Sequence, residues 1–210
     1  MIIMGNRKNK LLILGAGGHG KVIADCATCM GCYEEIAFLD DVAPQKNFSY
    51  QYLGSMDQYK NYIDQYDMIV AVGNSKIREK FLEELDTAKG SIPIIIHPKA
   101  IVSRSAIIGA GTVVMPGAVI NADVKIGKGA IVNTSCSIDH DSVIGDYAHI
   151  AVGAHLSGGV CIGKHTWIGA GAVVIQCISV CDNVMLGAGA VVINNIEESS
   201  TYVGVPATRI

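Results

Sequence analysis

Apolar residues recur every six positions from Ala100 to Asn195. Dividing this stretch into sixes gives sixteen hexads over 96 residues without an insertion, and the third position of every hexad is Val, Ile or Leu. The first position is small or β-branched in nearly every hexad. Because alternation along a strand directs positions one and three to the same side, each hexad predicts a short strand with a corner. Three hexads close a triangular coil, and stacked coils form a parallel β-helix with an aliphatic interior.

Glycine recurs at the fourth position of the hexads, directly after the large inward residue. Glycine accepts a positive φ without steric cost, so we expect this residue to turn the backbone at each corner. The periodicity does not determine the hand of the coil. Parallel crossovers are right-handed in about 98% of cases, which by itself favours a right-handed coil.

A different pattern occupies the N-terminal third. Short apolar strands alternate with stretches of helical character, in the order of a βαβαβ half of a doubly wound sheet. The expected strands are residues 10–14, 36–39 and 68–72, and the expected helices are residues 21–30 and 76–85.

These patterns predict an α/β, Rossmann-like N-terminal half-sheet followed by an all-β parallel β-helix. The predicted parts are a nucleotide-binding domain, a linker, the β-helix and a C-terminal cap, over residues 1–90, 91–99, 100–195 and 196–210. Gly204-Val205-Pro206-Ala207 should end the stacking of the coils.

Composition narrows the possible partners. The formal net charge is -3 and charged residues make up 17%, which provides no basic surface for nucleic acid. No stretch approaches the roughly 18 apolar residues of a membrane span, and Leu11–Leu14 is too short for a signal-peptide core, so we expect a cytoplasmic protein without membrane contact. The 24 glycines and 3 phenylalanines suit a core of stacked, identical layers.

The segment from Gly15 to Gly20 fits G-x-G-x-x-G, with a strand before it and a helix after it. Taken alone the motif indicates a dinucleotide, but the unit is too short for a second mononucleotide half, so NAD is not expected. We expect a single nucleotide, with its phosphate at the helix N-terminus and its ribose or base near Asp40 and Asp41. A tight turn that binds nothing is the alternative.

Within the repeats, the sequence Asp139-His140-Asp141 lies next to a corner. Histidine is the usual general base near neutral pH, and a neighbouring carboxylate can orient its ring and raise its basicity. Such an arrangement could deprotonate an attacking amine or hydroxyl. The alternative is a solvated corner with incidental charges.

His140 and His149 lie in the first and the third of three successive hexads, and therefore on different faces of the triangular coil. The two side chains therefore cannot easily meet within one chain. If both serve one active site, that site lies between subunits, and a homotrimer is the natural closed assembly for a triangular prism. No pair of histidines has a spacing typical of zinc ligands. Cys26, Cys29 and Cys32 have the spacing of part of an iron–sulfur motif, but the fourth ligand is missing, so no metal is expected.

With both halves considered, the chain resembles the bacterial sugar acetyltransferases of the NeuD and PglD type. The matching residues are the Gly15–Gly20 loop, Phe38-Leu39-Asp40-Asp41, Gly73-Asn74, Asn133-Thr134-Ser135, Asp139-His140-Asp141, His149 and Gly204-Val205-Pro206-Ala207. The resemblance implies a left-handed β-helix, the known exception to the usual hand, and acetyl-CoA as co-substrate.

The resemblance also implies roles for individual residues. His140 is the expected general base, with Asp141 or Asp139 as its support. The substrate-binding residues are expected to be Gly15, Gly17, Gly18, His19, Asp40, Asp41, Gly73, Asn74 and Asn133. The residues expected along the acetyl-CoA groove are His149, Gly158, Ala170 and Ala188. One departure is Asp141, where PglD-like enzymes have Glu.

The predicted reaction is N-acetylation of a UDP-linked 4-amino-sugar by direct transfer from acetyl-CoA. An acyl-enzyme is less attractive because no serine or cysteine in the repeats has a triad-like setting. Three alternatives remain: O-acetylation of sialic acid or a related sugar, a non-catalytic scaffold that binds a sugar nucleotide, and a nicotinamide-dependent enzyme. Intact Asp139-His140 argues against the scaffold.

Overall fold

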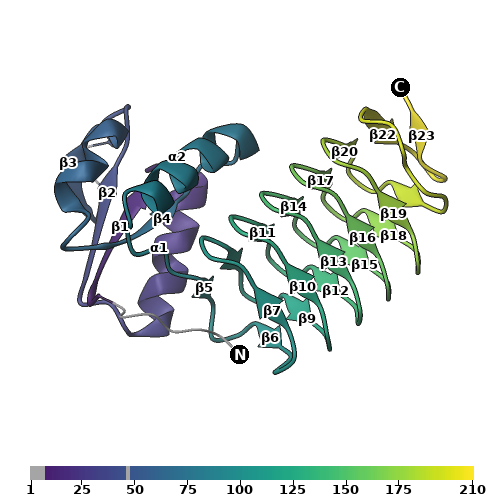
Figure 1. Ribbon diagram of the computed structural model, residues 1–210, viewed down its shortest axis with the longest axis horizontal. Coiled ribbons are helices and arrows are strands. Elements are labelled where there is room, and N and C mark those ends of the chain that lie inside the picture. Colours follow the sequence, from purple (N-terminus) through teal and green to yellow (C-terminus); the bar gives the residue numbers. More distant parts are fainter. Residues whose placement is uncertain (1–7, 46–47) are drawn as a thin grey trace. The chain divides into compact units, whose positions relative to one another are not determined.

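The computed structural model describes residues 8–45 and 48–210, so residues 1–7 of the predicted N-terminal domain lie outside the description. The chain divides into two compact units between Pro98 and Lys99. Each unit is built on one of the two sequence patterns (Figure 1).

The N-terminal unit contains a parallel sheet with the strand order β3-β2-β1-β4. Strand β1 pairs with β2 on one side and with β4 on the other, and the apolar residues of all three are buried except Ile36, which is half-buried. The strands are β1 (Lys10–Leu14), β2 (Glu35–Leu39), β3 (Gln51–Gly54) and β4 (Asp67–Val70).

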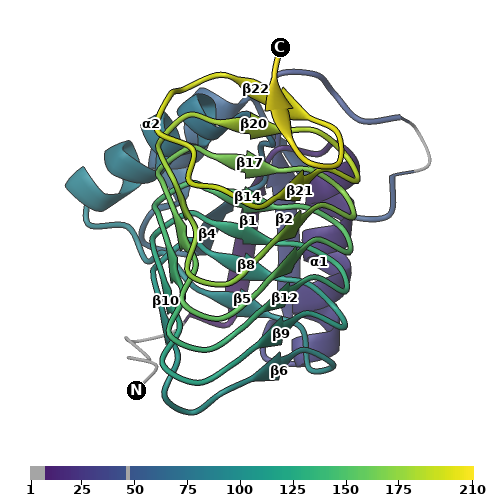
Figure 2. The ribbon, with the colours of Figure 1, turned by 90° about the vertical axis from the view of Figure 1, so that its right-hand side faces the viewer.

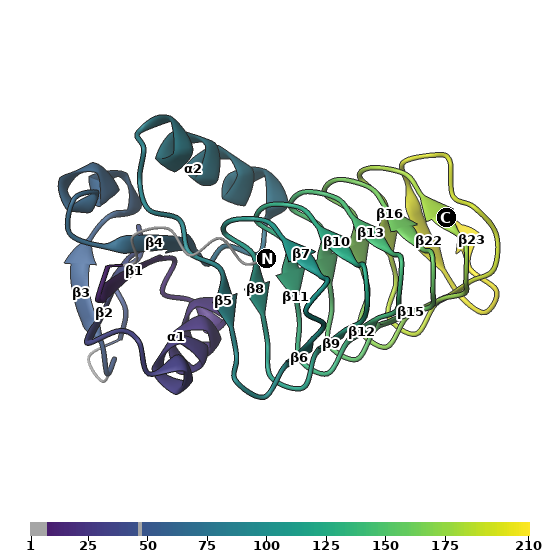
Figure 3. The ribbon, with the colours of Figure 1, turned by 60° about the horizontal axis from the view of Figure 1, so that its bottom comes forward.

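Two helices cover opposite sides of this sheet (Figure 3). They are α1 (Gly18–Met30), which ends at Gly31 in the left-handed conformation, and α2 (Ser75–Thr87). A 3-10 helix, η1 (Met56–Tyr62), precedes β4, and β5 (Ile95–Ile96) lies against α1. The expected strands and helices are present. The apolar pattern missed β3, because this edge strand is half-exposed and has no continuous apolar run.

The second unit is a three-faced coil of two-residue parallel strands. Paired residues are 18 apart, as in Ser137 and His155, so one coil consists of three hexads. Face 1 contains β6 (Ile101–Val102), β9 (Val119–Ile120), β12 (Ser137–Ile138), β15 (His155–Leu156), β18 (Val173–Val174) and β21 (Val191–Val192). Face 2 contains β7 (Ile107–Ile108), β10 (Lys125–Ile126), β13 (Val143–Ile144), β16 (Cys161–Ile162) and β19 (Ser179–Val180).

Face 3 is extended by the C-terminal segment. Its repeat strands are β8 (Val113–Val114), β11 (Ile131–Val132), β14 (His149–Ile150), β17 (Trp167–Ile168) and β20 (Met185–Leu186). β22 (Thr201–Val203) continues this ladder in parallel, and β23 (Thr208–Arg209) returns antiparallel to β22 (Figure 2). The parallel stacking therefore ends at Gly204–Ala207, where the chain reverses.

The inward positions of the hexads are those that the pattern predicts. The third residue of every hexad from Val114 to Val192 is buried, and so is the first residue from Ala106 to Ala190. Stacked small and branched side chains fill the interior of each coil, so the core repeats with the sequence.

The role expected for the fourth-position glycines is wrong. From Gly111 to Gly189 the residue with positive φ is the sixth of each hexad, as at Asp141, and not the fourth. Glycine occupies the fourth position because the next coil passes too close: a Cβ at Gly109 would stand 2.5 Å from Lys128 N. The absence of a side chain is required by coil-to-coil contact and not by backbone conformation.

Candidate functional site

The glycine loop after β1 packs tightly against its surroundings at its two ends. Gly15 has φ +114, and a Cβ there would lie 2.9 Å from the carbonyl oxygen of Ala71. At the other end, a Cβ on Gly20 would lie 2.0 Å from the Gly15 oxygen. Between them, Gly17 and Gly18 have nothing within 4 Å of the position of a Cβ. The middle of the loop is therefore the part that a ligand can approach.

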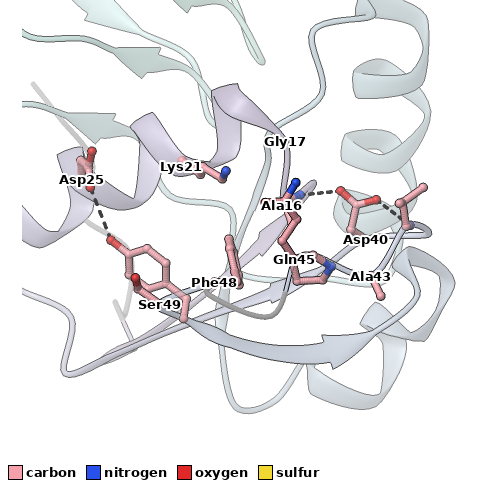
Figure 4. A pocket seen from close by; sticks show the side chains of 12 residues that line it. Ala16, Gly17, Lys21, Asp25, Asp40, Ala43, Gln45, Phe48 and Ser49 are labelled. Carbon is pink, nitrogen blue, oxygen red and sulfur yellow. Dashed lines mark hydrogen bonds between the residues drawn. The ribbon is translucent and has the colours of Figure 1, made fainter.

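A cavity of about 580 Å³ opens beside this loop (Figure 4). It lies between the loop, the first two turns of α1 and the segment that follows β2. Its lining residues are Ala16, Gly17, Lys21, Asp25, Asp40, Val42, Ala43, Pro44, Gln45, Phe48, Ser49 and Tyr50. Of the residues predicted to bind the substrate in this unit, Gly17 and Asp40 line the cavity.

Asp40 and Asp41 hold backbone around the cavity. The two oxygens of Asp40 accept the N–H groups of Ala16, at 2.6 Å, and of Val42, at 2.9 Å, which ties the glycine loop to the end of β2. Asp41 accepts the N–H of Met56 at 3.0 Å and does not line the cavity. Asp40 therefore shapes the cavity from its wall.

The Gly73-Asn74 turn has a structural explanation that the sequence pattern did not suggest. Asn74 Oδ1 accepts the N–H groups of Lys76 and Ile77, so Asn74 is the N-cap of α2. The oxygens of Val72 and Gly73 accept hydrogen bonds from the buried Arg78 guanidinium. Neither Gly73 nor Asn74 lines the cavity.

His19 is a largely buried side chain at the start of α1. Burial, aided by the nearby charge of Arg78, lowers the pKa of His19 to about 4. Its ring is thus neutral at physiological pH, and its Nε2 has no hydrogen-bond partner among the described residues. His19 and Gly18 belong to the loop but not to the wall of the cavity.

Sequence reasoning missed two charged residues that face the cavity. Lys21 and Asp25 lie one turn apart on α1, and the hydroxyl of Tyr50 is 3.5 Å from Asp25 Oδ1. Their four-residue spacing directly after the glycine loop was visible in the sequence. It would have placed both on one side of a helix that begins at the loop.

The corner between faces 1 and 2 carries His140. Its Nδ1 is 2.8 Å from Asp141 Oδ2, and its side chain is 60% exposed. Asp141 adopts φ 60 at the turn, which brings its carboxylate to the preceding ring. Because Nδ1–H donates to Asp141, the Nε2 atom of the neutral ring carries the free lone pair.

Asp139 has a different position. Its Oδ1 accepts the backbone N–H of His140 and the amide of Asn121, both at 2.8 Å, and these two hydrogen bonds lower the pKa of Asp139. The Asp141 hydrogen bond, followed by the charge of Asp139, raises the pKa of His140. Asp141 therefore contacts the ring, whereas Asp139 holds the backbone that carries it.

Gly158 lies at the same corner as His140, one coil further along. A Cβ at Gly158 would be 2.6 Å from both Cε1 and Nε2 of the imidazole. The Gly158 N–H donates to no acceptor among residues 8–45 and 48–210. The basic nitrogen and a backbone N–H without an acceptor in the described residues thus occur at one corner, where Gly158 is itself buried.

Face 3 brings Asn133 and His149 together. Asn133 Nδ2 is 3.0 Å from His149 Nε2, and the Trp167 ring lies against the imidazole with 4.3 Å between ring centroids. Asn133 Oδ1 accepts the N–H of Thr134, which orients the amide so that Nδ2 donates to the ring. His140 and His149 lie at different parts of the prism, as the count of faces predicts.

Ala170 and Ala188 lie at the corner between faces 3 and 1, after β17 and β20. The glycines that follow them, Gly171 and Gly189, have nothing within 4 Å of the position of a Cβ. This corner is therefore lined by small residues on successive coils.

The sequence did not predict a hydrogen bond between Ser137 and His155 on face 1. Ser137 Oγ is 2.8 Å from His155 Nδ1, on an exposed part of the sheet. No ion pair joins His155 to an acidic side chain among the described residues. The serine has a possible base but lacks the third member of a triad.

Neither a membrane-spanning helix nor a metal cluster occurs in the described part of the chain. No helix in it is long and apolar enough to cross a membrane. Within the same residues, no group of three or more His, Cys, Asp or Glu side chains could hold a metal ion.

The chain is similar to known proteins over both units. Residues 10–85 match the family described as the PglD N-terminal domain. The UDP-N-acetylbacillosamine N-acetyltransferase of Bacillus subtilis (strain 168) is 38% identical over 107 residues, which are 49% of this chain and 50% of that enzyme. That match thus spans half the length of the curated relative.

Solved structures match the whole chain. The acetyltransferase domain of PglB from Neisseria gonorrhoeae FA1090 is 42% identical with a TM-score of 0.93, covering 97% of this chain and 100% of that domain, which was also solved with acetyl coenzyme A. PerB from Caulobacter crescentus, solved with CoA and GDP-perosamine, is 30% identical with a TM-score of 0.88, covering 100% of this chain and 99% of PerB. These similarities and the parallel ladders confirm the predicted fold, an α/β half-sheet followed by a left-handed β-helix.

Proposed function

The chain belongs to the NeuD/PglD-type sugar acetyltransferases, and we propose that it transfers the acetyl group of acetyl-CoA to the amino group of a nucleotide-linked amino sugar. The relatives' names support this assignment, since they include a UDP-N-acetylbacillosamine N-acetyltransferase and proteins solved with acetyl coenzyme A or with CoA and GDP-perosamine. Transfer to an amine is accordingly preferred to O-acetylation of sialic acid.

One observation supports catalysis more than any other. His140 has its Nδ1 bound to Asp141 at 2.8 Å, its Nε2 directed to the corner, and Gly158 without a side chain beside that nitrogen. A scaffold that only binds a sugar nucleotide has no need for a basic nitrogen held in this way. The arrangement matches what a general base requires, a fixed tautomer and an accessible lone pair.

The proposed reaction is direct transfer. The sugar amine attacks the carbonyl carbon of the thioester while His140 Nε2 takes a proton from the attacking nitrogen. The C–N bond forms, the C–S bond breaks, and CoA leaves as a thiolate that regains a proton. Asp141 stabilises the imidazolium that develops, and the Gly158 N–H is suited to stabilise the oxyanion. Ser137 takes no part, since its hydroxyl belongs to a pair without an acidic partner.

The nucleotide of the substrate is assigned to the cavity beside Gly17 and Asp40. The relatives differ in their nucleotide, since one name contains UDP and another structure contains GDP-perosamine. We assign a UDP-linked 4-amino-sugar, because the relative named for a UDP-sugar is 38% identical and PerB is 30% identical. Gly18 and His19 belong to the same loop but do not line the cavity, so the assignment of these two residues to the ligand rests on the family resemblance.

A homotrimer is the proposed assembly, with each active site shared by two subunits. His140 and the Asn133–His149 pair lie on different parts of one prism, so a site using both requires a neighbouring chain. Large exposed apolar side chains on the strands of faces 1 and 2 support the association: Ile101 on face 1 is 67% exposed, and Ile107 and Val143 on face 2 are 56% and 43% exposed. His149, Ala170 and Ala188 of one subunit and Gly158 of the next then border acetyl-CoA. Because acetyl-CoA is its co-substrate, we assign the protein to the cytoplasm.

The proposal is tested by incubating the protein with acetyl-CoA and one acceptor at a time, and following free thiol release. The acceptors are a UDP-linked 4-amino-sugar, GDP-perosamine and sialic acid. We expect acceptor-dependent release with an amino sugar and an N-acetylated product by mass spectrometry. Thiol release with sialic acid alone would indicate O-acetylation. No release with any acceptor would favour the alternative of a non-catalytic scaffold that binds a sugar nucleotide. Sedimentation velocity tests the trimer independently.

A further inference from the structure

Lys21 is a cationic residue in the cavity of the N-terminal unit. The family resemblance assigns no role to this residue. We propose that Lys21 binds the diphosphate of the nucleotide-linked substrate. The inference deepens the proposed function and rests on it for the identity of the ligand. Lys21 is exposed, lines the cavity and follows the glycine loop on the first turn of α1. Its side-chain amine makes no hydrogen bond or ion pair within the described part of the chain, and its backbone N–H donates to the Gly17 oxygen.

The charges of the cavity explain why a cation is needed. The other charged side chains among the residues that line the cavity are the carboxylates of Asp25 and Asp40. Asp40 is already held by two backbone N–H groups, but it remains close to the glycine loop. A helix N-terminus contributes only about half a positive charge, which does not balance a diphosphate beside two carboxylates. Lys21 supplies the missing charge at that end of the cavity.

The positions of the side chains define a direction for the ligand. In Figure 4 the amine of Lys21 points toward Gly17, whereas Asp25 lies further along α1, at the opposite end. Asp25 is paired with Tyr50, and the rings of Tyr50 and Phe48 are 5.8 Å apart between centroids. An aromatic wall beside a carboxylate suits a base and the hydroxyls of a ribose. The diphosphate accordingly lies at the Lys21 end, next to Gly17.

Calorimetric titration of the full chain with UDP, GDP and uridine tests the inference. Lys21→Met should weaken the binding of the better diphosphate by about 10- to 100-fold, the usual loss for a hydrogen bond to a charged group. Uridine binding should not change, and Lys21→Arg should retain most of the affinity for the diphosphate. Lys80→Met, an exposed lysine on α2 outside the cavity, is the matched control and should bind as the natural chain does.

The outcomes separate this inference from the proposed function. Equal affinities of Lys21→Met and the natural chain for UDP and GDP would overturn the assignment of Lys21, even if acetyl transfer is observed. An equal loss for uridine and UDP would also overturn it, since the lysine would then serve the nucleoside or the fold. Binding of neither diphosphate by the natural chain would refute it as well. A selective loss of diphosphate affinity in Lys21→Met, together with no acetyl transfer by the natural chain, would support the assignment of Lys21 and contradict the proposed acetyltransferase activity.

Discussion

The imidazole of His140 lies directly against the backbone of Gly158, which occupies the same corner one coil further along. A Cβ at residue 158 would stand 2.6 Å from Nε2, a distance that no carbon and nitrogen in non-bonded contact adopt. On its other edge the ring is held by Asp141 at 2.8 Å. The position of the proposed base is therefore determined by the Asp141 carboxylate on one edge of the ring and by the absence of a side chain at Gly158 on the other.

Gly158→Ala should lower kcat by about 10²-fold, because the added methyl group displaces the ring and a misplacement of about 1 Å costs this much. Steady-state kinetics with acetyl-CoA and the amino sugar measure the effect. A double variant with His140→Ala supplies the control, since Gly158→Ala should have little further effect once the ring is gone. Additive losses in the double variant would show that Gly158 acts independently of His140.

His140→Ala should lower kcat by on the order of 10² to 10⁴, the usual contribution of general base catalysis. Ser137→Ala should leave kcat within about two-fold, because direct transfer uses no nucleophilic serine. Both variants are assayed by thiol release at saturating acetyl-CoA. Normal turnover by His140→Ala, or a large loss in Ser137→Ala, would contradict the proposed mechanism.

The pH dependence of kcat/KM should reflect the raised pKa of His140. A general base acts in its neutral form, so the rate should rise with pH and level off above a pKa higher than the ordinary 6.5 of histidine. Asp141→Asn removes the hydrogen bond that contributes most to this shift. The acid limb should then move to lower pH, with a lower plateau. A limb that stays in place would show that Asp141 does not contact the titrating group.

Mixed trimers test whether the active site is shared between subunits. His140→Ala and His149→Ala subunits are each expected to be impaired alone. If a site uses His140 from one chain and His149 from its neighbour, every trimer that contains both variants restores both residues at about a third of its sites. Co-expression with two different tags, followed by assay of the doubly purified trimer, measures the recovery. Activity no higher than that of the separate variants would place each site within one chain.

Thr166 joins two coils of the β-helix through a buried hydroxyl. Its Oγ1 donates to the Cys181 oxygen at 2.8 Å and accepts the Val184 N–H at 3.1 Å. Thr166→Val keeps the shape but leaves both backbone groups unsatisfied, which should lower the free energy of unfolding by about 1–3 kcal/mol. Urea denaturation at one protein concentration measures it. Thr87→Val, at an exposed position of α2, is the control and should change stability by less than about 0.5 kcal/mol.

The positions of the side chains that follow from local alternation could be predicted from the sequence. The hexads indicated which residues fill the interior, because a strand directs alternate side chains to opposite sides whatever the rest of the chain does. The glycine loop at Gly15–Gly20 could be identified from its spacing, and His140 from the aspartates on either side of it. The left-handed coil came from the resemblance, since the general preference of parallel crossovers is for the other hand.

Contacts between coils and between loops required the tertiary structure. Asp139 and Asp141 both adjoin His140 in the sequence, and only the turn at Asp141, with φ 60, decides which carboxylate contacts the ring. The fourth-position glycines are required because the neighbouring coil leaves no room for a Cβ. Lys21 faces the cavity because α1 begins at the glycine loop. The sequence by itself determined the β-helix and its repeating core, because each hexad carries the same local pattern. Stacking decided what surrounds the imidazole, because it brings residues 18 apart into contact and local alternation does not specify what each neighbouring coil presents.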